Sequence, residues 1–210
     1  MHCPVCLDRS PVELLTVDAL AYWRCESCQA RFLDPDQLPD RAAEKREYDR
    51  HENDTDDPGY RQFLGQLSNP LLNRIDPGSS GLDYGCGPGP ALARLLEEAG
   101  HSVATWDPIY APDDSVLKQR YDFITCTEVV EHFHHPAAEF RRLDRLLKPG
   151  GWLGIMTRFQ TDDSRFANWH YRRDPTHVVF YREATFEWLG KHYGWEVECI
   201  APQVVLVRKR

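Results

Sequence analysis

Hydrophobic residues in the second half of the chain form short runs separated by longer segments of mixed character. The short apolar runs predict strands at 81–85, 102–106, 123–128 and 152–157. Between these runs, apolar positions recur three and four residues apart, which predicts helices near 90–99 and 137–147. Strands that alternate with helices in this way predict an α/β fold with a mostly parallel sheet.

The same periodicities continue to the C-terminus. A helix is predicted near 183–192, followed by two strands at 195–201 and 203–208 that are joined at Pro202. We therefore assign 60–210 to one main domain, which begins with apolar residues at helical spacing.

The first 34 residues alternate only weakly in polarity, but they hold two C-x-x-C pairs. The pairs are Cys3/Cys6 and Cys25/Cys28, with residues 7–24 between them, a spacing typical of zinc sites. Two thiolate pairs on tight turns complete a tetrahedral S4 site that suits Zn²⁺. The alternatives are four unrelated buried thiols, or a redox role that needs only one pair.

A small zinc ribbon with a short hairpin is therefore predicted over 1–34. About 30 residues cannot bury a self-sufficient core, so the ion would be structural and would supply much of the folding free energy. Four thiolates leave no open coordination position for catalysis.

The connector, residues 35–59, is polar and rich in charge. This composition predicts either a solvated linker or a lid over the site of the main domain. A short helix is expected between Asp40 and Arg50, and a lid would bring Tyr48 and His51 to the site.

Composition narrows the class of partners. The chain has 25 Lys and Arg against 33 Asp and Glu, a net charge of −8, which repels phosphate backbones unless a basic patch is present. No run approaches about 18 uninterrupted apolar residues, and the N-terminus lacks the charged and apolar segments of a secretory signal. We therefore expect a cytoplasmic protein without a membrane or DNA partner, whose seven cysteines serve metal binding or burial rather than disulfides.

A glycine-rich turn follows the first strand of the main domain, in the order Asp83-Tyr84-Gly85-Cys86-Gly87-Pro88-Gly89. Strand, glycine turn and helix form the nucleotide-binding arrangement of α/β folds. A carboxylate two residues before the first glycine would repel a pyrophosphate but suits a ligand with a cationic amine. Asp107 closes the next strand and can take both ribose hydroxyls. Together these features point to a nucleoside amino acid rather than NAD.

These residues resemble motif I of the class I S-adenosylmethionine-dependent methyltransferases. Further matches follow in the family's order: Asp107 as the ribose-binding acid, 121–132 as the fourth-strand motif and 146–151 as the turn into the fifth strand. The resemblance implies a Rossmann-like, mostly parallel sheet with flanking helices and a C-terminal antiparallel hairpin, preceded here by the zinc ribbon.

The resemblance also implies S-adenosylmethionine as the cofactor. The residues that would contact it are Asp83, Gly85, Cys86, Gly87, Asp107, Pro108 and Glu128, together with Tyr48 and His51 of the connector. One departure is a short connection between Asp107 and Tyr121, which is too short for the family's third strand and its helix. We therefore expect the sheet to lack that edge strand, and we assign no adenine contact.

Three histidines are candidates for the catalytic side of the site. His132 follows the fourth strand and is a candidate base, with a capped loop as the alternative. The long segment 158–181 adds Trp169, His170 and His177 as substrate-side candidates, and Arg172 and Arg173 as holders of an anionic group. We do not expect the histidines to bind a metal.

The favoured function is S-adenosylmethionine-dependent methylation of an unidentified small molecule. The alternative is an RNA- or protein-modifying methyltransferase whose ribbon recognises the macromolecule. A non-enzymatic adaptor is disfavoured because Asp83, Gly85, Gly87 and Asp107 are intact. The negative charge favours a small molecule over RNA.

Overall fold

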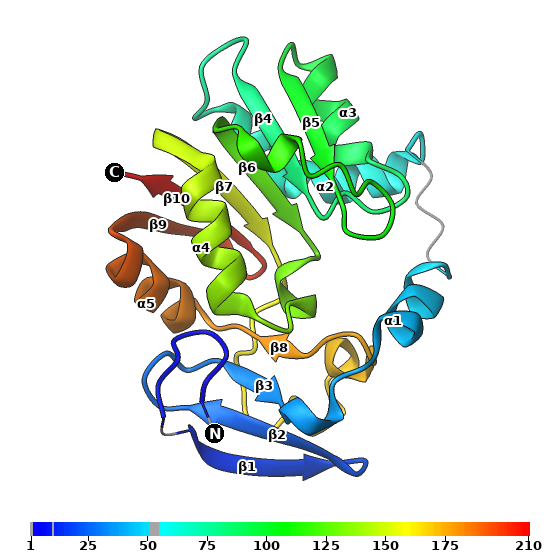
Figure 1. Cartoon of the computed structure of the whole chain (residues 1–210), viewed down its shortest axis with the longest axis vertical. Coiled ribbons are helices and arrows are strands. Elements are labelled where there is room, and N and C mark those ends of the chain that lie inside the picture. Colours follow the sequence, from blue (N-terminus) through cyan, green and yellow to red (C-terminus); the bar gives the residue numbers. More distant parts are fainter. Residues whose placement is uncertain (1, 10, 51–54) are drawn as a thin grey trace.

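A six-stranded sheet of order β5-β4-β6-β7-β10-β9 lies at the centre of the larger part of the molecule (Figure 1). The computed structural model describes residues 2–9, 11–50 and 55–210. The strands of this sheet are β4 (Ser80–Tyr84), β5 (Ser102–Trp106), β6 (Tyr121–Thr127), β7 (Leu147–Met156), β9 (Trp195–Ala201) and β10 (Val204–Lys209). The first four pair in parallel, and β10 runs antiparallel to β7 and β9. The predicted parallel sheet with a C-terminal antiparallel hairpin is confirmed.

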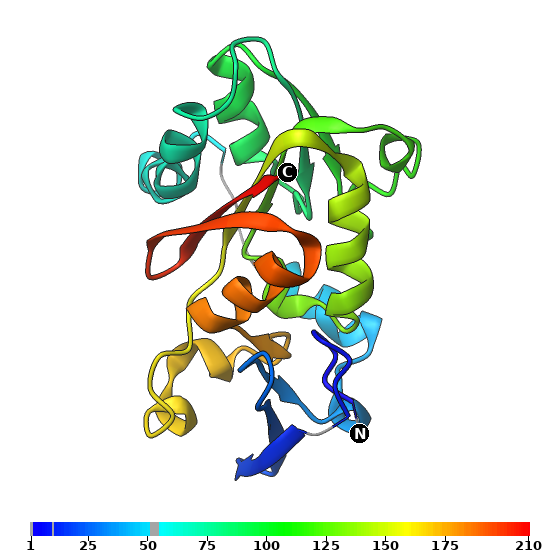
Figure 2. The ribbon, with the colours of Figure 1, turned by 90° about the vertical axis from the view of Figure 1, so that its left-hand side faces the viewer.

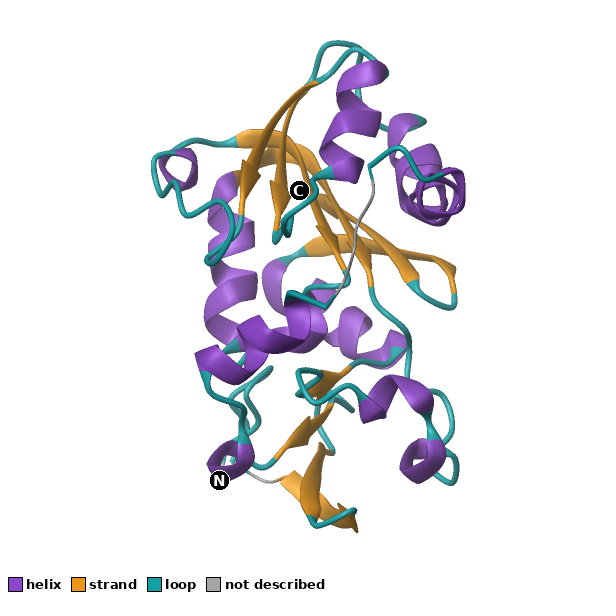
Figure 3. Cartoon of the chain, turned by 90° about the vertical axis from the view of Figure 1, so that its right-hand side faces the viewer, coloured by secondary structure: helices purple, strands orange, loops and turns teal. Residues whose placement is uncertain are grey.

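Helices cover both faces of this sheet (Figure 3). They are α2 (Pro58–Leu72), α3 (Ala91–Glu98), α4 (Pro136–Leu146) and α5 (Glu183–Tyr193). On β6, Phe123 packs in one apolar cluster with Leu67 of α2, whereas its neighbour Ile124 packs in the other cluster with Phe140 of α4. Strands that are buried on both faces read as continuous apolar runs, as this sequence does. Among the described residues, no helix has the length and apolar character needed to cross a membrane.

The connection from Asp107 to Tyr121 contains no strand, and all of its residues are described. It forms a single 3-10 turn, η2 (Val116–Lys118), and leaves β5 at the edge of the sheet. The prediction that the third strand of the resembled fold is missing is therefore confirmed.

Cys25 ends a strand of a second, antiparallel sheet of order β1-β2-β3-β8, whereas Cys3, Cys6 and Cys28 lie outside the strands of this sheet. Its strands are β1 (Pro11–Val17), β2 (Leu20–Cys25), β3 (Arg31–Leu33) and β8 (Val179–Phe180). The expected hairpin is β1–β2, but the fourth strand comes from the segment that follows β7, which descends to the small sheet in Figure 2. The N-terminal module and the later segment thus share one sheet.

Backbone hydrogen bonds tie this small sheet to the strand ends of the large one. Leu33 N donates to Val178 O at 2.8 Å, and Val178 N donates to Glu131 O at 2.9 Å. Ala137 N, at the start of α4, donates to Pro4 O at 2.9 Å. The remaining short elements are α1 (Arg41–Tyr48), η1 (Pro35–Gln37), η3 (Val130–His132), η4 (Phe166–Asn168) and η5 (His170–Arg173).

Two glycine substitutions should change stability in opposite directions. A Cβ at Gly81 of β4 would lie 2.1 Å from the Phe123 ring, so Gly81→Ala should lower the free energy of unfolding by about 2 kcal/mol or more. A Cβ at Gly65 of α2 would meet Asn69 at 3.4 Å, so Gly65→Ala should raise it by about 0.5–1 kcal/mol through helix propensity. Urea unfolding of both variants measures the difference, and a stabilised Gly81→Ala protein would contradict this packing.

Candidate active site

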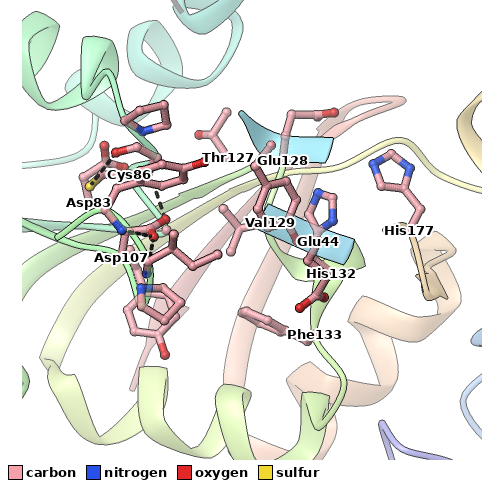
Figure 4. A pocket seen from close by; sticks show the side chains of 18 of the residues that line it. Glu44, Asp83, Cys86, Asp107, Thr127, Glu128, Val129, His132, Phe133 and His177 are labelled. Carbon is pink, nitrogen blue, oxygen red and sulfur yellow. Dashed lines mark hydrogen bonds between the residues drawn. The ribbon is translucent and has the colours of Figure 1, made fainter. Parts of the chain in front are cut away.

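A cavity of about 1050 Å³ lies at the carboxyl ends of β4, β5 and β6, where α/β folds bind their ligands. The predicted site residues that line it are Tyr48, Asp83, Gly85, Cys86, Gly87, Asp107, Pro108, Glu128, His132, His170 and His177. His51 lies outside the described residues. In Figure 4, Asp83, Cys86 and Asp107 lie at one end of the cavity, and His132 and His177 lie at the other.

The glycine turn brings the backbone close to this cavity. Gly85 has a φ of 80°, and a Cβ there would lie 2.6 Å from the side chain of Val129. Gly85 N donates to Trp106 O at 2.7 Å, and Gly87 N donates to Asp107 Oδ2 at 3.2 Å. A larger residue at Gly85 would have a strained backbone, and its side chain would collide with Val129.

Asp107 is held rigidly by main-chain donors. Its Oδ1 accepts hydrogen bonds from Ile109 N at 2.8 Å and Tyr110 N at 2.9 Å, while its Oδ2 accepts the one from Gly87. A carboxylate has room for about four such bonds, so it can still accept one from a ligand hydroxyl.

Asp83 is a buried acid at the base of the glycine turn. Thr125 Oγ1 donates to its Oδ1 at 2.7 Å. Burial nevertheless raises the pKa of Asp83 to about 6, because removing a carboxylate from water disfavours its charged form. A cationic ligand at this end of the cavity would favour the ionised form.

Two more acids lie near the far end: Glu128 is partly buried and lines the cavity, whereas Glu131 is fully buried and is not among the lining residues. Glu128 has a φ of 52°, a strained value for a residue with a side chain, and its N–H donates to Met156 O at 2.8 Å. Burial raises the pKa of Glu128 and of Glu131. The Tyr171 hydroxyl donates to Glu131 Oε1 and lies 3.3 Å from Glu128 Oε2, so it joins the two acids.

The histidines at this end differ in their surroundings. His132 Nδ1 lies 3.0 Å from Thr176 O, and His177 Nδ1 lies 2.7 Å from Tyr171 O. The two rings meet edge to face with their centroids 4.7 Å apart. His170 is exposed, and its Nε2 lies 3.2 Å from Arg158 Nη1. His132 and His177 therefore form a fixed pair, and His170 lies at the rim.

Helix α1 of the connector also lines the cavity. Tyr48 packs against His132 with ring centroids 5.3 Å apart, and Glu44 lies 2.8 Å from Nε2 of His134. At the other end, Arg41 donates to Pro108 O at 2.5 Å. Sequence reasoning missed Arg41 and Glu44, because nothing distinguishes them from other charges on a polar helix.

Three of the predicted substrate-side residues are not brought to the cavity. Trp169, Arg172 and Arg173 are not among the residues that line the cavity. Arg172 is buried and instead donates to Asp18 Oδ2 at 2.8 Å, in the turn between β1 and β2. The local sequence could not show this contact, because its two residues are far apart along the chain.

The fold and the cavity define an α/β protein of the nucleotide-cofactor-binding class. Comparison narrows this class, because residues 55–200 match a family model described as a methyltransferase domain. The chain belongs to this family and has a class I S-adenosylmethionine-dependent methyltransferase domain.

The similar proteins agree with this assignment. A ubiquinone biosynthesis O-methyltransferase from Proteus mirabilis is 34% identical over 99 residues, which cover 44% of this chain and 38% of that protein. Its counterpart from Serratia proteamaculans is 36% identical over 78 residues, covering 37% and 32%. The matches thus span about a third of the length of these relatives.

Two solved structures share the fold. A SAM-dependent methyltransferase from Archaeoglobus fulgidus has a TM-score of 0.55 at 16% identity, over 71% of this chain and 94% of that one. A 1,6-didemethyltoxoflavin-N1-methyltransferase from Burkholderia thailandensis, solved with its substrate and S-adenosylhomocysteine, has a TM-score of 0.51 at 19% identity, over 94% and 99%.

The buried acid at the glycine turn should make stability depend on pH. The pKa of Asp83 is about 6 in the fold against an ordinary value of 3.8, so the wild type loses stability as pH rises through this range. Asp83→Asn has no charge to bury, and without ligand it should be more stable than the wild type at pH 8 by on the order of 2 kcal/mol. Urea unfolding at pH 5 and pH 8 should show a smaller difference at pH 5.

Asp122→Asn is the matched control with the opposite sign. Burial opposes ionisation of Asp122, but hydrogen bonds from Lys148 and Ser80 outweigh it and hold its pKa below the ordinary value. That substitution should therefore reduce stability at pH 8. Equal losses in both variants at pH 8 would contradict the assigned burial of Asp83.

Proposed function

We propose that this methyltransferase transfers the methyl group of S-adenosylmethionine to a small molecule bound at the histidine end of the cavity. The observation that supports this proposal is one continuous cavity whose two ends differ in chemistry (Figure 4). One end has the glycine turn and Asp107, and the other has Glu128, His132 and His177.

The glycine-turn end suits the cofactor. Asp107 can accept a hydrogen bond from a ribose hydroxyl, and Cys86 and Pro108 would lie against the nucleoside. Asp83 would offset the cationic amino acid group across the glycine turn. Bound S-adenosylmethionine supplies a methyl group already activated on a cationic sulfur, so the chain's own task is to align an acceptor with it and to exclude water.

The opposite end suits a small acceptor. A cavity of about 1050 Å³ exceeds what one drug-sized ligand needs, so cofactor and acceptor can fit together. The curated relatives are named as O-methyltransferases of ubiquinone biosynthesis, and the Burkholderia protein is named as a 1,6-didemethyltoxoflavin-N1-methyltransferase. His132 and His177 would face the acceptor, with His170 at the entrance.

We also propose that the four cysteines bind a structural zinc ion. The Cys3 and Cys28 sulfurs lie 3.6 Å apart, and those of Cys6 and Cys25 lie 3.4 Å apart, close to the roughly 3.8 Å edge of a tetrahedral S4 zinc site. All four sulfurs lie within 4.8 Å of one another. The donor set is thiolate only, which favours zinc.

The two cysteine turns have matching backbones. Leu7 and Gln29, each directly after the second cysteine of its pair, both have a φ of 63°. Leu7 N donates to Cys3 O, and Gln29 N donates to Cys25 O, each at 2.9 Å. These paired turns support one ion that holds residues 1–34 as a module beside the active site.

The proposed function predicts that binding of S-adenosylhomocysteine, the product of the cofactor, depends on Asp107. Asp107→Asn should weaken S-adenosylhomocysteine binding at least about tenfold in calorimetry, because the amide loses the charge-assisted hydrogen bond to the ribose. Asp113→Asn is the control, since Asp113 is exposed and does not line the cavity.

The acceptor class is tested with a methyl-labelled cofactor and a cell extract separated by size. Label should enter the low-mass fraction with the wild type and not with Asp107→Asn. Label that enters RNA or protein instead, and that falls steeply as salt rises for RNA, would overturn the small-molecule proposal in favour of a macromolecular substrate.

Metal analysis tests the zinc proposal. The purified protein should contain about one zinc ion per chain that Cys3→Ser removes, and this variant should unfold at a lower urea concentration. Cys199→Ser is the matched control, because Cys199 is exposed on β9 and outside the cluster. Zinc content equal in the wild type and Cys3→Ser would rule the site out.

A further inference from the structure

Three potential metal ligands converge at the histidine end of the cavity, separate from the cysteines. One ligand atom each from Glu131, His132 and His177 lies within 4.8 Å of the other two. Ligands of one ion held at about 2.1 Å lie roughly 3–3.5 Å apart, so small rotations would close the set. Glu131 and His132 belong to η3, and the Val178–Glu131 backbone hydrogen bond brings His177 beside them.

Both imidazoles are oriented as metal ligands usually are. A carbonyl oxygen only accepts hydrogen bonds, so His132 Nδ1 donates to Thr176 O and His177 Nδ1 donates to Tyr171 O. The lone pair of each neutral ring is then on Nε2. A backbone acceptor on the second nitrogen fixes the tautomer and ring plane of metal-ligating histidines in this manner.

The two carboxylate oxygens of Glu131 differ in their hydrogen bonding. Glu131 is fully buried, and its Oε1 accepts the hydrogen bond from Tyr171. Its Oε2 is buried and has no hydrogen-bond partner among the residues that the structure describes. Leaving a buried carboxylate oxygen unsatisfied is costly, and a cation would remove that cost.

The groups that face this cluster add negative charge. Asp174 Oδ2 lies 3.8 Å from His177 Nε2, and Glu128 reaches the cluster through Tyr171. The nearby cation is Arg158, which acts on Glu128 and contacts His170. Three carboxyl groups thus share one nearby arginine, and a bound divalent cation would favour their ionised forms.

We propose that Glu131, His132 and His177 bind a divalent metal ion, and that this ion receives an oxygen of the methyl acceptor. The inference rests on the proposed function and narrows it, because it makes the acceptor a hydroxyl compound whose oxygen can coordinate a metal. It also replaces our expectation that the histidines do not bind metal, and it makes His132 a ligand rather than a base.

The reaction balances without a further reagent. A hydroxyl that coordinates a divalent cation loses its proton more readily, and the proton passes to solvent. The oxygen then forms a bond to the methyl carbon as the carbon–sulfur bond breaks, and its electron pair stays on sulfur. The products are a methyl ether, neutral S-adenosylhomocysteine and one proton.

Manganese binding tests the site without any acceptor. Protein treated with a chelating resin is titrated with Mn²⁺, and free Mn²⁺ is followed by electron paramagnetic resonance, since Mn²⁺ prefers oxygen and nitrogen ligands to thiolates. The wild type should bind one Mn²⁺ per chain, and Glu131→Gln and His177→Gln should each weaken binding at least about tenfold. His192→Gln, on α5 and stacked on Trp188, should bind as the wild type does.

Zinc retained after the resin is counted in the same samples. A second zinc ion per chain that both substitutions remove would support the site equally. No bound metal beyond the cysteine site at millimolar Mn²⁺, or binding unchanged in both variants, would overturn the proposal.

Calorimetry with S-adenosylhomocysteine separates this outcome from failure of the methyltransferase proposal. Binding retained by the wild type and both variants shows that they are folded and that the cofactor end is intact. Loss of metal binding alone then rejects only the metal site, whereas a wild type that binds no S-adenosylhomocysteine rejects the proposed function.

Discussion

The backbone hydrogen bond from Val178 to Glu131 joins the small cysteine-containing sheet to the strand ends of the large one. Each partner has a histidine beside it in sequence, so this main-chain contact also determines where His132 and His177 meet. The pairing of β3 with β8 continues from it, and Leu33 completes the junction through Val178. Distortion of the small sheet would therefore move one wall of the cavity, although none of its four clustered cysteines lines that cavity.

The large sheet was predictable because its determinants are local. Residues such as Phe123 and Ile124 are adjacent in sequence and buried on opposite faces, so apolar runs mark the strands directly. The glycine turn and the C-x-x-C pairs are also short patterns whose spacing carries their chemistry. His51, which the connector pattern also suggested, lies outside the described residues.

The parts that were not predictable depend on long-range contacts. Strand β8 has two residues and exists only because β3 pairs with it. Arg172 pairs with Asp18, and α1 reaches Pro108 through Arg41, although neither contact leaves a local signal. Glu131 lies within the 121–132 motif that the sequence shows, but only the fold reveals that one Glu131 oxygen is buried without a partner in the described part of the chain. Burial raises the pKa of Asp83, Glu128 and Glu131, and a cationic cofactor and a metal would both favour the ionised forms of these acids.

The short connection after Asp107 also affects how molecules of this protein behave toward one another. It leaves β5 at the edge of the sheet, with no strand beyond it among the described residues. An edge strand presents unpaired N–H and C=O groups that can pair with another chain and start aggregation. β5 has only five residues, and Arg41 and Tyr110 place polar contacts at its carboxyl end. The edge that the missing strand leaves open is therefore short. It offers few backbone groups to another molecule, which limits the tendency to aggregate.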